Sequence, residues 1–513
     1  MLFVKFILAM LPILWLIVAL SGLKMAGHKA CLIALLLTVV LAVGYWKLSF
    51  LWTLSAALEG VLNAIWPICL VIVAALFTYN VTLKTGAMEL IKQMLASVST
   101  DKRILALIIG WGFGNFMEGM AGFGTAVAIP ASMLAGIGLD PISAVLGCLV
   151  VNSTPTAFGS VGVPTVTLAS VTGLDALPLA GDVAVIQCIL TFISPFLMVC
   201  ICGKGIKALK GMIPTTLIAS LSFTIPWFIT AKVIGPELPD VIGSICSMLC
   251  IIAAAKIFHK QPDSDYAIEV ADTNNTAITA ESQWKAWSPF ILIFILLMCT
   301  STLCPPIHNA IAGIKSQIVV YAGNDGNTLS FSWINTPGVM IFIAAIIGGL
   351  IQGASIAEMV TVLGQTLKKY WKTILTICSV MAIAKIMSYS GMISDIAKLL
   401  VVVAGSFYPF IAPLIGGLGA FVTGSGTSTC VLFGGLQTET ATSLGLSPSW
   451  MAAANVMGAG IGKMICPQGI AIGAGAINAV GSESKILRAV FKYFILYILL
   501  AGIICFVGSA LGI

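Results

Sequence analysis

The amino-acid sequence predicts an all-α polytopic membrane protein with about 12 spans and two re-entrant hairpins. Composition is the first reason. Of the 513 residues, 59% are hydrophobic and 9% are charged, against roughly 25% charged in an ordinary soluble domain. Secondly, apolar stretches of the ~20 residues that a helix needs to cross a bilayer recur along the chain. Thirdly, two long apolar stretches, 104–172 and 408–480, are interrupted by clusters of Gly, Pro, Ser, Thr and Asn.

Uninterrupted apolar windows predict the individual spans. The first window lacks the small-residue cleavage site of a signal peptide and leads into another apolar segment, so we take it as a span. Polar composition predicts loops at 259–283 and 321–335. The predicted helices lie near 6–22, 30–46, 61–83, 183–203, 211–233, 241–258, 289–304, 338–354, 373–390 and 490–512.

The order of these segments predicts two halves. Residues 1–258 form the first half, with its core at 84–172. Residues 289–513 form the second half, with its core at 389–480. Residues 259–288 are expected to be a cytoplasmic linker.

The net charge of +6 comes from basic residues that stand in small groups between apolar segments. Such groups are typical of topology signals rather than of nucleic-acid binding, which needs a basic face. If the spans alternate, most basic residues fall on one side, which the positive-inside rule makes cytoplasmic, with both termini outside. Lys385 and Lys463 lie at membrane depth. The opposite, external side of the membrane holds only Lys5, Lys47, Lys232, Lys315 and Lys398.

Cysteine and histidine usage argues against a metal site. The fourteen cysteines stand nearly all singly within apolar stretches and form no CxxC pair, and the chain has only three histidines. This pattern favours small buried thiols over metal ligands or a disulfide framework. We therefore expect neither a metal nor a cofactor.

A weak internal repeat relates the two interrupted stretches. Lys84-Thr-Gly precedes the first stretch and Tyr389-Ser-Gly precedes the second, while Gly138-Leu-Asp-Pro is matched by Gly445-Leu-Ser-Pro. By the charge distribution the first copy begins inside and the second outside. Inverted repeats with paired interrupted helices are typical of secondary transporters, whose binding site lies at the interruptions. No ATP-binding motif is present, so an ion gradient is expected to drive transport.

The first interruption places a carboxylate, Glu118, among Gly119, Gly122 and Gly124 at the tip of a predicted hairpin. An ionised carboxylate at membrane depth costs about 2.5–3.5 kcal/mol or more on insertion scales, and loss of solvation favours the protonated form. Glu118 is therefore the predicted proton carrier. The alternative is a glutamate at an interface or a helix end. Glu59, before the third span, is predicted to be interfacial.

The sequence Asn152-Ser153-Thr154-Pro155 interrupts the next helix. Proline cannot donate a backbone hydrogen bond and blocks helical continuation. A half-helix that restarts after the break points its N–H groups and positive dipole end at the membrane middle, which suits an anion. Ser153 and Thr154 would add hydroxyl donors. A proline kink packed against its neighbours is an equally weighted alternative.

The second copy has a hydroxyl-rich hairpin tip at 423–429. Its hydroxyl residues alternate with Gly424 and Gly426, and they exceed what bonding to the backbone four residues earlier would need. The tip resembles those that hold carboxylates in other transporters, and this resemblance implies that it holds a small carboxylate.

Lys463 lies beside the second interrupted helix, before Pro467, and is the candidate counter-charge for that carboxylate. A structural pair with Glu118 or a helix-end position is the alternative. The predicted substrate-binding residues are Asn152, Ser153, Thr154, Thr423, Ser425, Thr427, Ser428, Asn455, Lys463 and Gln468.

A channel, a membrane enzyme and a dicarboxylate transporter are alternative functions. A channel has no need for paired inverted breaks around one site. An enzyme would need a nucleophile with its base, or metal ligands, at membrane depth, whereas His28, His259 and His308 fall in predicted loops. One strong cation candidate, Lys463, suits one carboxylate better than two, which favours a monocarboxylate.

Four motifs resemble signatures of the L-lactate permease family. The resemblance extends from about Pro12 to the C-terminus. It implies uptake of lactate, and often glycolate, with a proton across the bacterial cytoplasmic (inner) membrane. By analogy with related ion transporters it also implies an elevator-like fold. The motifs are Glu118–Ile129, Cys148–Gly159, Gly235–Pro239 and Gly462–Gln468.

The chain departs from the family pattern at the predicted site. Gly426 stands where the family commonly has Asp, Cys466 replaces a usual serine, and Ser153-Thr154 stand where Thr-Ala is common. These differences leave sodium coupling and a dicarboxylate cargo as alternatives to a proton and lactate. The expected partners are thus a small carboxylate, a proton or sodium ion, and the lipid bilayer, with no nucleic acid; a homo-oligomer is left open.

The charge distribution generates a topological prediction: residues 84–103 are cytoplasmic and residues 392–408 are external. Single cysteines in these two segments, in a background without reactive native cysteines, should react with an impermeant reagent added outside only at 392–408. Labelling of both segments, or of 84–103 alone, would exclude the inverted repeat.

Overall fold

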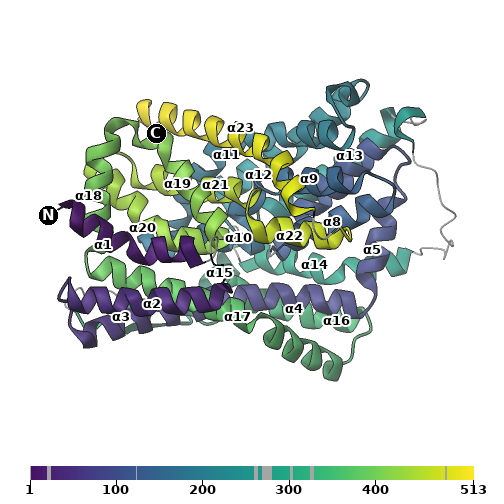
Figure 1. The fold of residues 1–513 in the computed structure, drawn as a ribbon. Coiled ribbons are helices and arrows are strands. Elements are labelled where there is room, and N and C mark those ends of the chain that lie inside the picture. The colour runs from purple at the N-terminus through teal and green to yellow at the C-terminus, as the bar shows by residue number, and fades with distance from the viewer. Residues whose placement is uncertain are drawn as a thin grey trace.

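The computed structural model describes residues 2–19, 23, 25–122, 124–258, 264–267, 280–300, 304–323, 328–479 and 482–512. These residues form a nearly all-helical protein with one small sheet (Figure 1). Nine helices in the described part of the chain are long and apolar enough to cross a membrane, and a bent pair of shorter helices adds a tenth candidate. The structure is thus that of a multi-pass membrane protein.

The helices of the first half precede residue 259. They are α1 (Leu2–Ile17), α2 (Gly27–Gly44), α3 (Phe50–Asn63), α4 (Leu70–Lys84), α5 (Ala87–Ala96), α6 (Lys102–Leu105), α7 (Gly114–Met120), α8 (Thr125–Gly136), α9 (Pro141–Val151), α10 (Gly159–Thr172), α11 (Ala176–Cys202), α12 (Ile213–Val233) and α13 (Pro239–Phe258).

The helices of the second half follow in the same manner. They are α14 (Ala280–Thr300), α15 (Pro305–Ala312), α16 (Pro337–Ile351), α17 (Ile356–Tyr389), α18 (Met392–Ala404), α19 (Tyr408–Thr423), α20 (Gly426–Leu444), α21 (Pro448–Lys463), α22 (Pro467–Ala476) and α23 (Glu483–Ala510).

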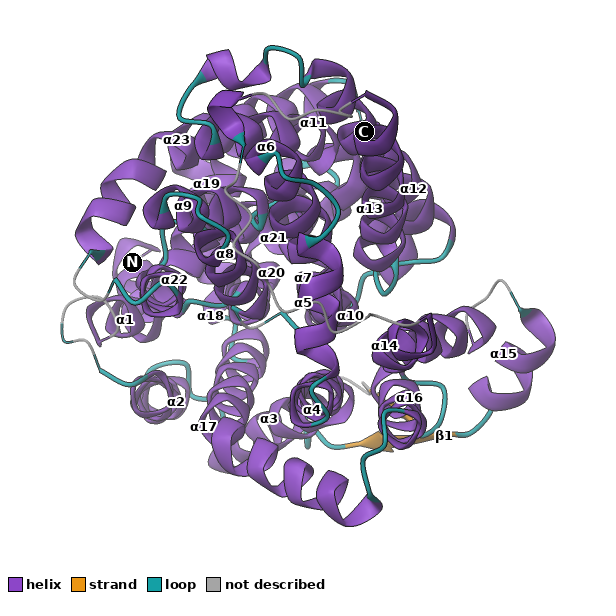
Figure 2. Cartoon of the chain, turned by 90° about the vertical axis from the view of Figure 1, so that its right-hand side faces the viewer, coloured by secondary structure: helices purple, strands orange, loops and turns teal. Residues whose placement is uncertain are grey.

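The long helices run roughly side by side and form two groups, which Figure 2 shows nearly end-on. One group, here called the core bundle, comprises α7–α13 and α19–α23, in which α19 packs on α21 and α10 on α20. The other group, the peripheral layer, comprises α2, α3, α4, α14, α16 and α17, in which α17 packs on α2 and α3. Helix α17 also contacts α20, so the two groups meet there.

Two hairpins and two interrupted helices lie in the core bundle, at the positions where glycine and proline predicted breaks. Helix α7 turns back into α8 through Gly124, whose φ of +87° suits glycine. Helix α19 turns into α20 through Gly424, with a φ of +69°. Helices α9 and α10 are separated at 152–158 and bent by 59°. Helices α21 and α22 are separated at 464–466.

The predicted spans agree with most helices but differ at three of them. Helix α14 begins at Ala280 rather than at 289, so it includes the last residues of the predicted linker 259–288. The span predicted at 61–83 belongs to a longer apolar segment, Phe50–Lys84, in which a wide turn at Ala64–Cys69 joins α3 to α4. The span predicted at 373–390 begins earlier, because α17 starts at Ile356. A cluster of lysines near residue 370 lowers the local hydropathy and hides this first part from an apolar-window search.

The prediction of an all-α protein is wrong for one segment. Residues 321–335, predicted as a loop, contain strand β2 (Thr328–Ser332), which pairs antiparallel with β1 (Lys315–Val319). Tyr321, just after β1, stacks on Tyr389 of α17 with ring centroids 3.8 Å apart. Strand β1 is exposed along its whole length and shows no alternation, whereas β2 (Thr-Leu-Ser-Phe-Ser) alternates polar and apolar residues, a strand signal that the interpretation as a loop overlooked.

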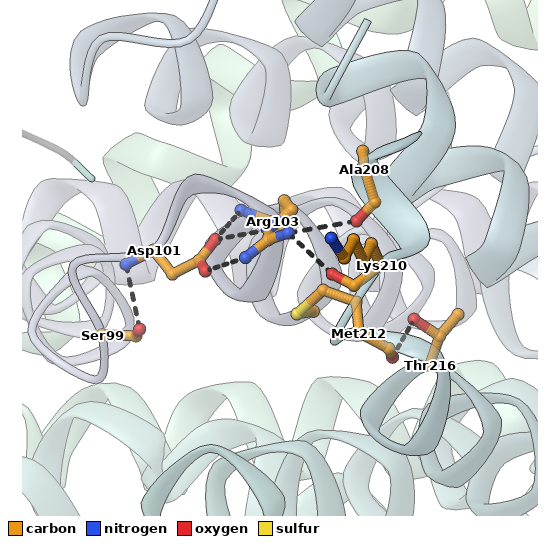
Figure 3. A network of polar contacts seen from close by, with 7 residues as sticks. All are labelled: Ser99, Asp101, Arg103, Ala208, Lys210, Met212 and Thr216. Atoms are coloured by element: carbon orange, nitrogen blue, oxygen red, sulfur yellow. Dashed lines mark hydrogen bonds and ion pairs between the residues drawn. The ribbon is translucent and has the colours of Figure 1, made fainter. Parts of the chain in front are cut away.

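A buried ion pair fastens the start of α6 to the loop between α11 and α12 (Figure 3). Arg103 lies 2.7 Å from Asp101 and donates hydrogen bonds to the carbonyl oxygens of Ala208 and Lys210, each at 3.2 Å. Its guanidinium also lies 4.0 Å from the centre of the Tyr266 ring, within the linker between the halves. These contacts hold three segments together at one end of the core bundle.

Candidate functional site

A cavity of about 450 Å³ lies where the core bundle meets the peripheral layer. From the core bundle it is lined by residues of both hairpins and both interrupted helices, and from the peripheral layer by residues of α2 and α17. Among the lining residues are Glu118, Asn152, Thr156, Ser160, Thr423, Ser425, Gly426, Thr427, Ser428, Lys463 and Gln468.

Glu118 is the residue that joins the parts of this site. It lies near the end of α7, is 2% exposed, and accepts two hydrogen bonds. Lys463 Nζ lies 2.8 Å from Glu118 Oε1, and Asn152 Nδ2 lies 2.9 Å from Glu118 Oε2. One carboxylate therefore links the first hairpin to the breaks in both interrupted helices.

Glycine at position 159 makes room for this carboxylate. A Cβ atom on Gly159 would lie 2.7 Å from Glu118 Oε1, closer than real Cβ contacts come. Gly159 begins α10, directly after the break. The glycine thus allows the chain to approach the ion pair before the left-handed turn at Ser160–Gly162, after which the regular helix continues.

Lys463 is both a partner of Glu118 and part of the cavity wall. It is the last residue of α21, and its side chain is 18% exposed, against 3% for Glu118. The pairing that the sequence left as an alternative is therefore present in this structure. Because the lysine also lines the cavity, the pair does not exclude a contact with substrate.

The hydroxyl-rich hairpin tip lines the cavity opposite. Ser425 caps α20, with its Oγ accepting a hydrogen bond from the Ser428 N–H at 3.2 Å. Thr423 and Thr429 place their hydroxyl oxygens 3.1 Å apart. The first turn of α20, from Gly426 to Ser428, lines the cavity. This helix end combines a positive dipole with hydroxyl groups, which suits an anion.

Several predicted site residues do not line the cavity. Ser153 and Thr154 donate their hydroxyls to the carbonyl oxygens of Val150 and Val151, at 2.6 and 3.3 Å. Asn455 is fully buried in α21, and its side-chain oxygen lies 3.4 Å from Gln437 Nε2. The predicted backbone positions absent from the lining are Gly119, Gly122, Pro155 and Pro467; those that line it are Gly124, Gly424 and Gly426.

Sequence reasoning missed the wall that the peripheral layer provides. His28 of α2 and Lys372, Thr373 and Thr376 of α17 all line the cavity. No local motif marks them, because they become neighbours of the core bundle only through tertiary packing. Lys372 adds a second lysine to the cavity, so the count of cations no longer separates one carboxylate from two.

The predicted loop positions of the histidines need correction. His28 lies in the first turn of α2, and His308 lies in α15 with its Nδ1 2.9 Å from the Thr300 carbonyl oxygen. The glycine before His28 and the prolines before His308 suggested loops, but these residues begin α2 and α15. His259 lies outside the described residues. Among the described residues, no three His, Cys, Asp or Glu side chains gather as metal ligands.

A second buried ion pair lies away from the cavity, and it corrects the prediction for Glu59. This glutamate is 3% exposed rather than interfacial. Lys385 Nζ lies 2.7 Å from Glu59 Oε1, and the Tyr389 hydroxyl lies 3.0 Å from both carboxylate oxygens. The partners come from α17, more than three hundred residues later, which explains why Glu59 alone suggested an interface.

Comparisons with known proteins agree on one family. A family model described as L-lactate permease matches residues 5–512. The L-lactate permease of Streptococcus iniae is 43% identical over 451 residues, covering 87% of this chain and 93% of that protein. The glycolate permease GlcA of Escherichia coli K12 is 32% identical, covering 97% of this chain and 94% of that protein.

One solved structure is similar in fold. It is that of Neisseria gonorrhoeae MtrF, described as illuminating a class of antimetabolite efflux pumps, with a TM-score of 0.51 and 13% sequence identity. The likeness covers 94% of this chain and 95% of that chain. At this identity the comparison concerns the fold alone.

Proposed function

We propose, from the premise that this chain belongs to the L-lactate permease family, that it carries lactate and glycolate across the bacterial inner membrane by proton symport. The names of its relatives support the cargo. The observation that carries the mechanism is the Glu118–Lys463 ion pair in the cavity wall, at 2.8 Å. A permease of this kind moves its substrate without changing it, so the chain is not expected to be an enzyme.

The substrate carboxylate would lie between Lys463 and the first turn of α20. Lys463 supplies full charge, Ser425 and Thr427 supply hydroxyl donors, and the helix end supplies a positive dipole. Asn152 also lines the cavity, and its side-chain amide donates a hydrogen bond to Glu118. The 2-hydroxyl group of lactate would then face the remaining polar wall of the cavity, where Gln468 lies.

Coupling follows from competition for one lysine. While Glu118 is ionised, its charge neutralises Lys463, and an incoming carboxylate finds little net attraction. Protonation of Glu118 removes that charge and leaves the ammonium group for lactate. A bound proton therefore raises the affinity for lactate, and bound lactate raises the affinity for the proton. By linkage, the two affinities rise by the same factor. The lactate affinity should fall as pH rises and Glu118 loses its proton.

The transport cycle would use an inverted repeat of about 12 spans and an elevator-like movement. Each copy supplies an amphipathic helix, a hairpin and an interrupted helix in the same order: α5, α7–α8 and α9–α10, then α18, α19–α20 and α21–α22. The cavity at the boundary with α2 and α17 suits sliding of the core bundle past the peripheral layer. We place both termini outside and leave oligomerisation open.

Sodium symport is the second candidate. Gly426 lines the cavity where the family pattern commonly has Asp, so a carboxylate that could take part in proton transfer is missing. A Cβ atom at this position would lie 3.2 Å from Thr156 Cγ2, so the side chain of an Asp would begin beside Thr156. With glycine at position 426, proton coupling would depend on Glu118 alone, which is why sodium is the second candidate.

Glu118→Gln should abolish lactate uptake driven by a proton gradient in proteoliposomes while preserving counterflow exchange. The amide keeps the size of the carboxyl group and frees Lys463, but it cannot cycle a proton. Uptake of labelled lactate under an imposed pH gradient, compared with exchange at equal pH, measures both. If gradient-driven accumulation persists, Glu118 is not the coupling group. Equal loss of both activities would indicate a role in folding or binding.

Lys463→Met should weaken lactate binding by about ten- to a hundredfold, because a charge-assisted hydrogen bond contributes roughly 1.5–3 kcal/mol. Ser425→Ala removes a neutral donor and should cost less, about 0.5–1.5 kcal/mol. Lys385→Met is the matched control, since it breaks an equally buried ion pair away from the cavity. Isothermal titration on folded, detergent-solubilised protein gives the affinities. Unchanged affinity in Lys463→Met would make this lysine purely structural.

A further inference from the structure

A second carboxyl group lies behind Glu118, in the seam between α7 and α13. Helix α13 runs antiparallel to α7 and to the π-helical turn Ala106–Phe113 that leads into it: Gly119 of α7 meets Asp240, and Gly112 of the preceding turn meets Met248. A Cβ atom on Gly119 would lie 2.8 Å from Asp240 Cβ, so glycine is needed for this approach. Asp240 directly follows the motif Gly235–Pro239, to which the transport mechanism above assigns no role.

Asp240 is buried, and no lysine, arginine or histidine among the described residues forms an ion pair with it. It is 1% exposed, and its Oδ1 accepts a hydrogen bond from Trp227 Nε1 at 2.9 Å. Its Oδ2 is buried and has no hydrogen-bond partner in the described part of the chain. Lys463 is close enough to interact electrostatically with Asp240, but Lys463 already pairs with Glu118. The Glu118 charge also acts on Asp240, with the opposite sign. Glu237, three residues earlier, is the other titratable group nearby.

Two further polar side chains in the same seam, Asn115 and Ser244, have no hydrogen-bond partner among the residues that the structure describes. Asn115 and Ser244 are fully buried, and neither amide atom of Asn115 nor the Ser244 hydroxyl is hydrogen-bonded within the described residues. Asn115 precedes Gly119 by one turn, and Ser244 follows Asp240 by one turn, so each pair shares a helix face. Since the helices are antiparallel, Asn115 and Ser244 lie at the same level. The seam therefore carries a line of polar groups that leads to Asp240.

The buried surroundings of Asp240 restrict the protonation state that its carboxyl group can adopt. An ionised carboxylate with one hydrogen bond and no cation of its own is costly in an apolar interior, whereas the protonated acid is not. Buried polar atoms nearly always have hydrogen-bond partners, and water supplies them where the protein does not. A protonated Asp240 joined to Asn115 and Ser244 through water satisfies both requirements.

We propose that Asp240 is a second proton-holding carboxyl group of the transport site, which passes its proton to Glu118 when lactate binds. The step conserves charge: the proton leaves Asp240 Oδ2, Glu118 becomes neutral, and Asp240 becomes the carboxylate. Asp240 then regains a proton through the polar seam. This inference rests on the proposed proton symport and adds a proton donor to it.

Infrared difference spectroscopy of the folded protein between two pH values reports protonated carboxyl groups directly. The unaltered protein should show a carboxylic-acid band that Asp240→Asn removes. Glu59→Gln should leave the band in place, because Glu59 is an equally buried carboxylate that a lysine already neutralises.

Transport supplies the second readout. Asp240→Asn should slow gradient-driven uptake but leave the final accumulation of lactate and its affinity unchanged, because a relay affects rate and Asp240 does not line the cavity. An unaltered band in Asp240→Asn, with uptake at its normal rate, overturns the inference while symport stands. Thermal stabilisation by sodium that Asp240→Asn removes also overturns it, in favour of a sodium site. Uptake that ignores the proton gradient in the unaltered protein instead overturns the proposed symport.

Discussion

A carboxylate buried in a membrane protein needs compensating partners, and Glu118 takes both of its partners from interrupted helices. Lys463 ends α21 at the second break, and Asn152 follows α9 at the first. Both partners therefore stand at helix ends, where the two breaks meet the first hairpin. The hairpin that carries Glu118 and the two interrupted helices thus meet at one ionisable group in the cavity wall.

Close packing of glycine makes this junction possible. Gly460 of α21 meets the Ser153 carbonyl at the first break, and Gly462 meets the Gly417 carbonyl of α19. Small residues let helices approach where the surrounding lipid supplies no hydrophobic force between them. The peripheral layer contributes differently, with His28, Thr373 and Thr376 forming a polar wall that the core bundle faces. A movement of one group past the other would change the exposure of the cavity without dismantling the ion pair.

The sequence predicted those features that depend on local chemistry. Apolar length indicated most of the spans, and the proline and glycine clusters indicated the breaks, so Glu118, Asn152 and Lys463 were candidates before any contact was known. What depends on distant segments was not predictable: Glu59 gave no sign that Lys385 would neutralise it, and the wall from α2 and α17 has no motif. Ser153 and Thr154 carried the right chemistry, but the turn that follows α9 directs their hydroxyls back to the backbone.

If lactate and Glu118 compete for Lys463, lactate binding is coupled to protonation of Glu118, and the protons taken up during binding can be counted. Isothermal titration of lactate in buffers of different ionisation enthalpy gives the number of protons taken up per lactate bound, with no gradient and no transport. At a pH where Glu118 is ionised, competition for Lys463 predicts uptake of about one proton per lactate. Lactate binding with no proton uptake at any pH would contradict it.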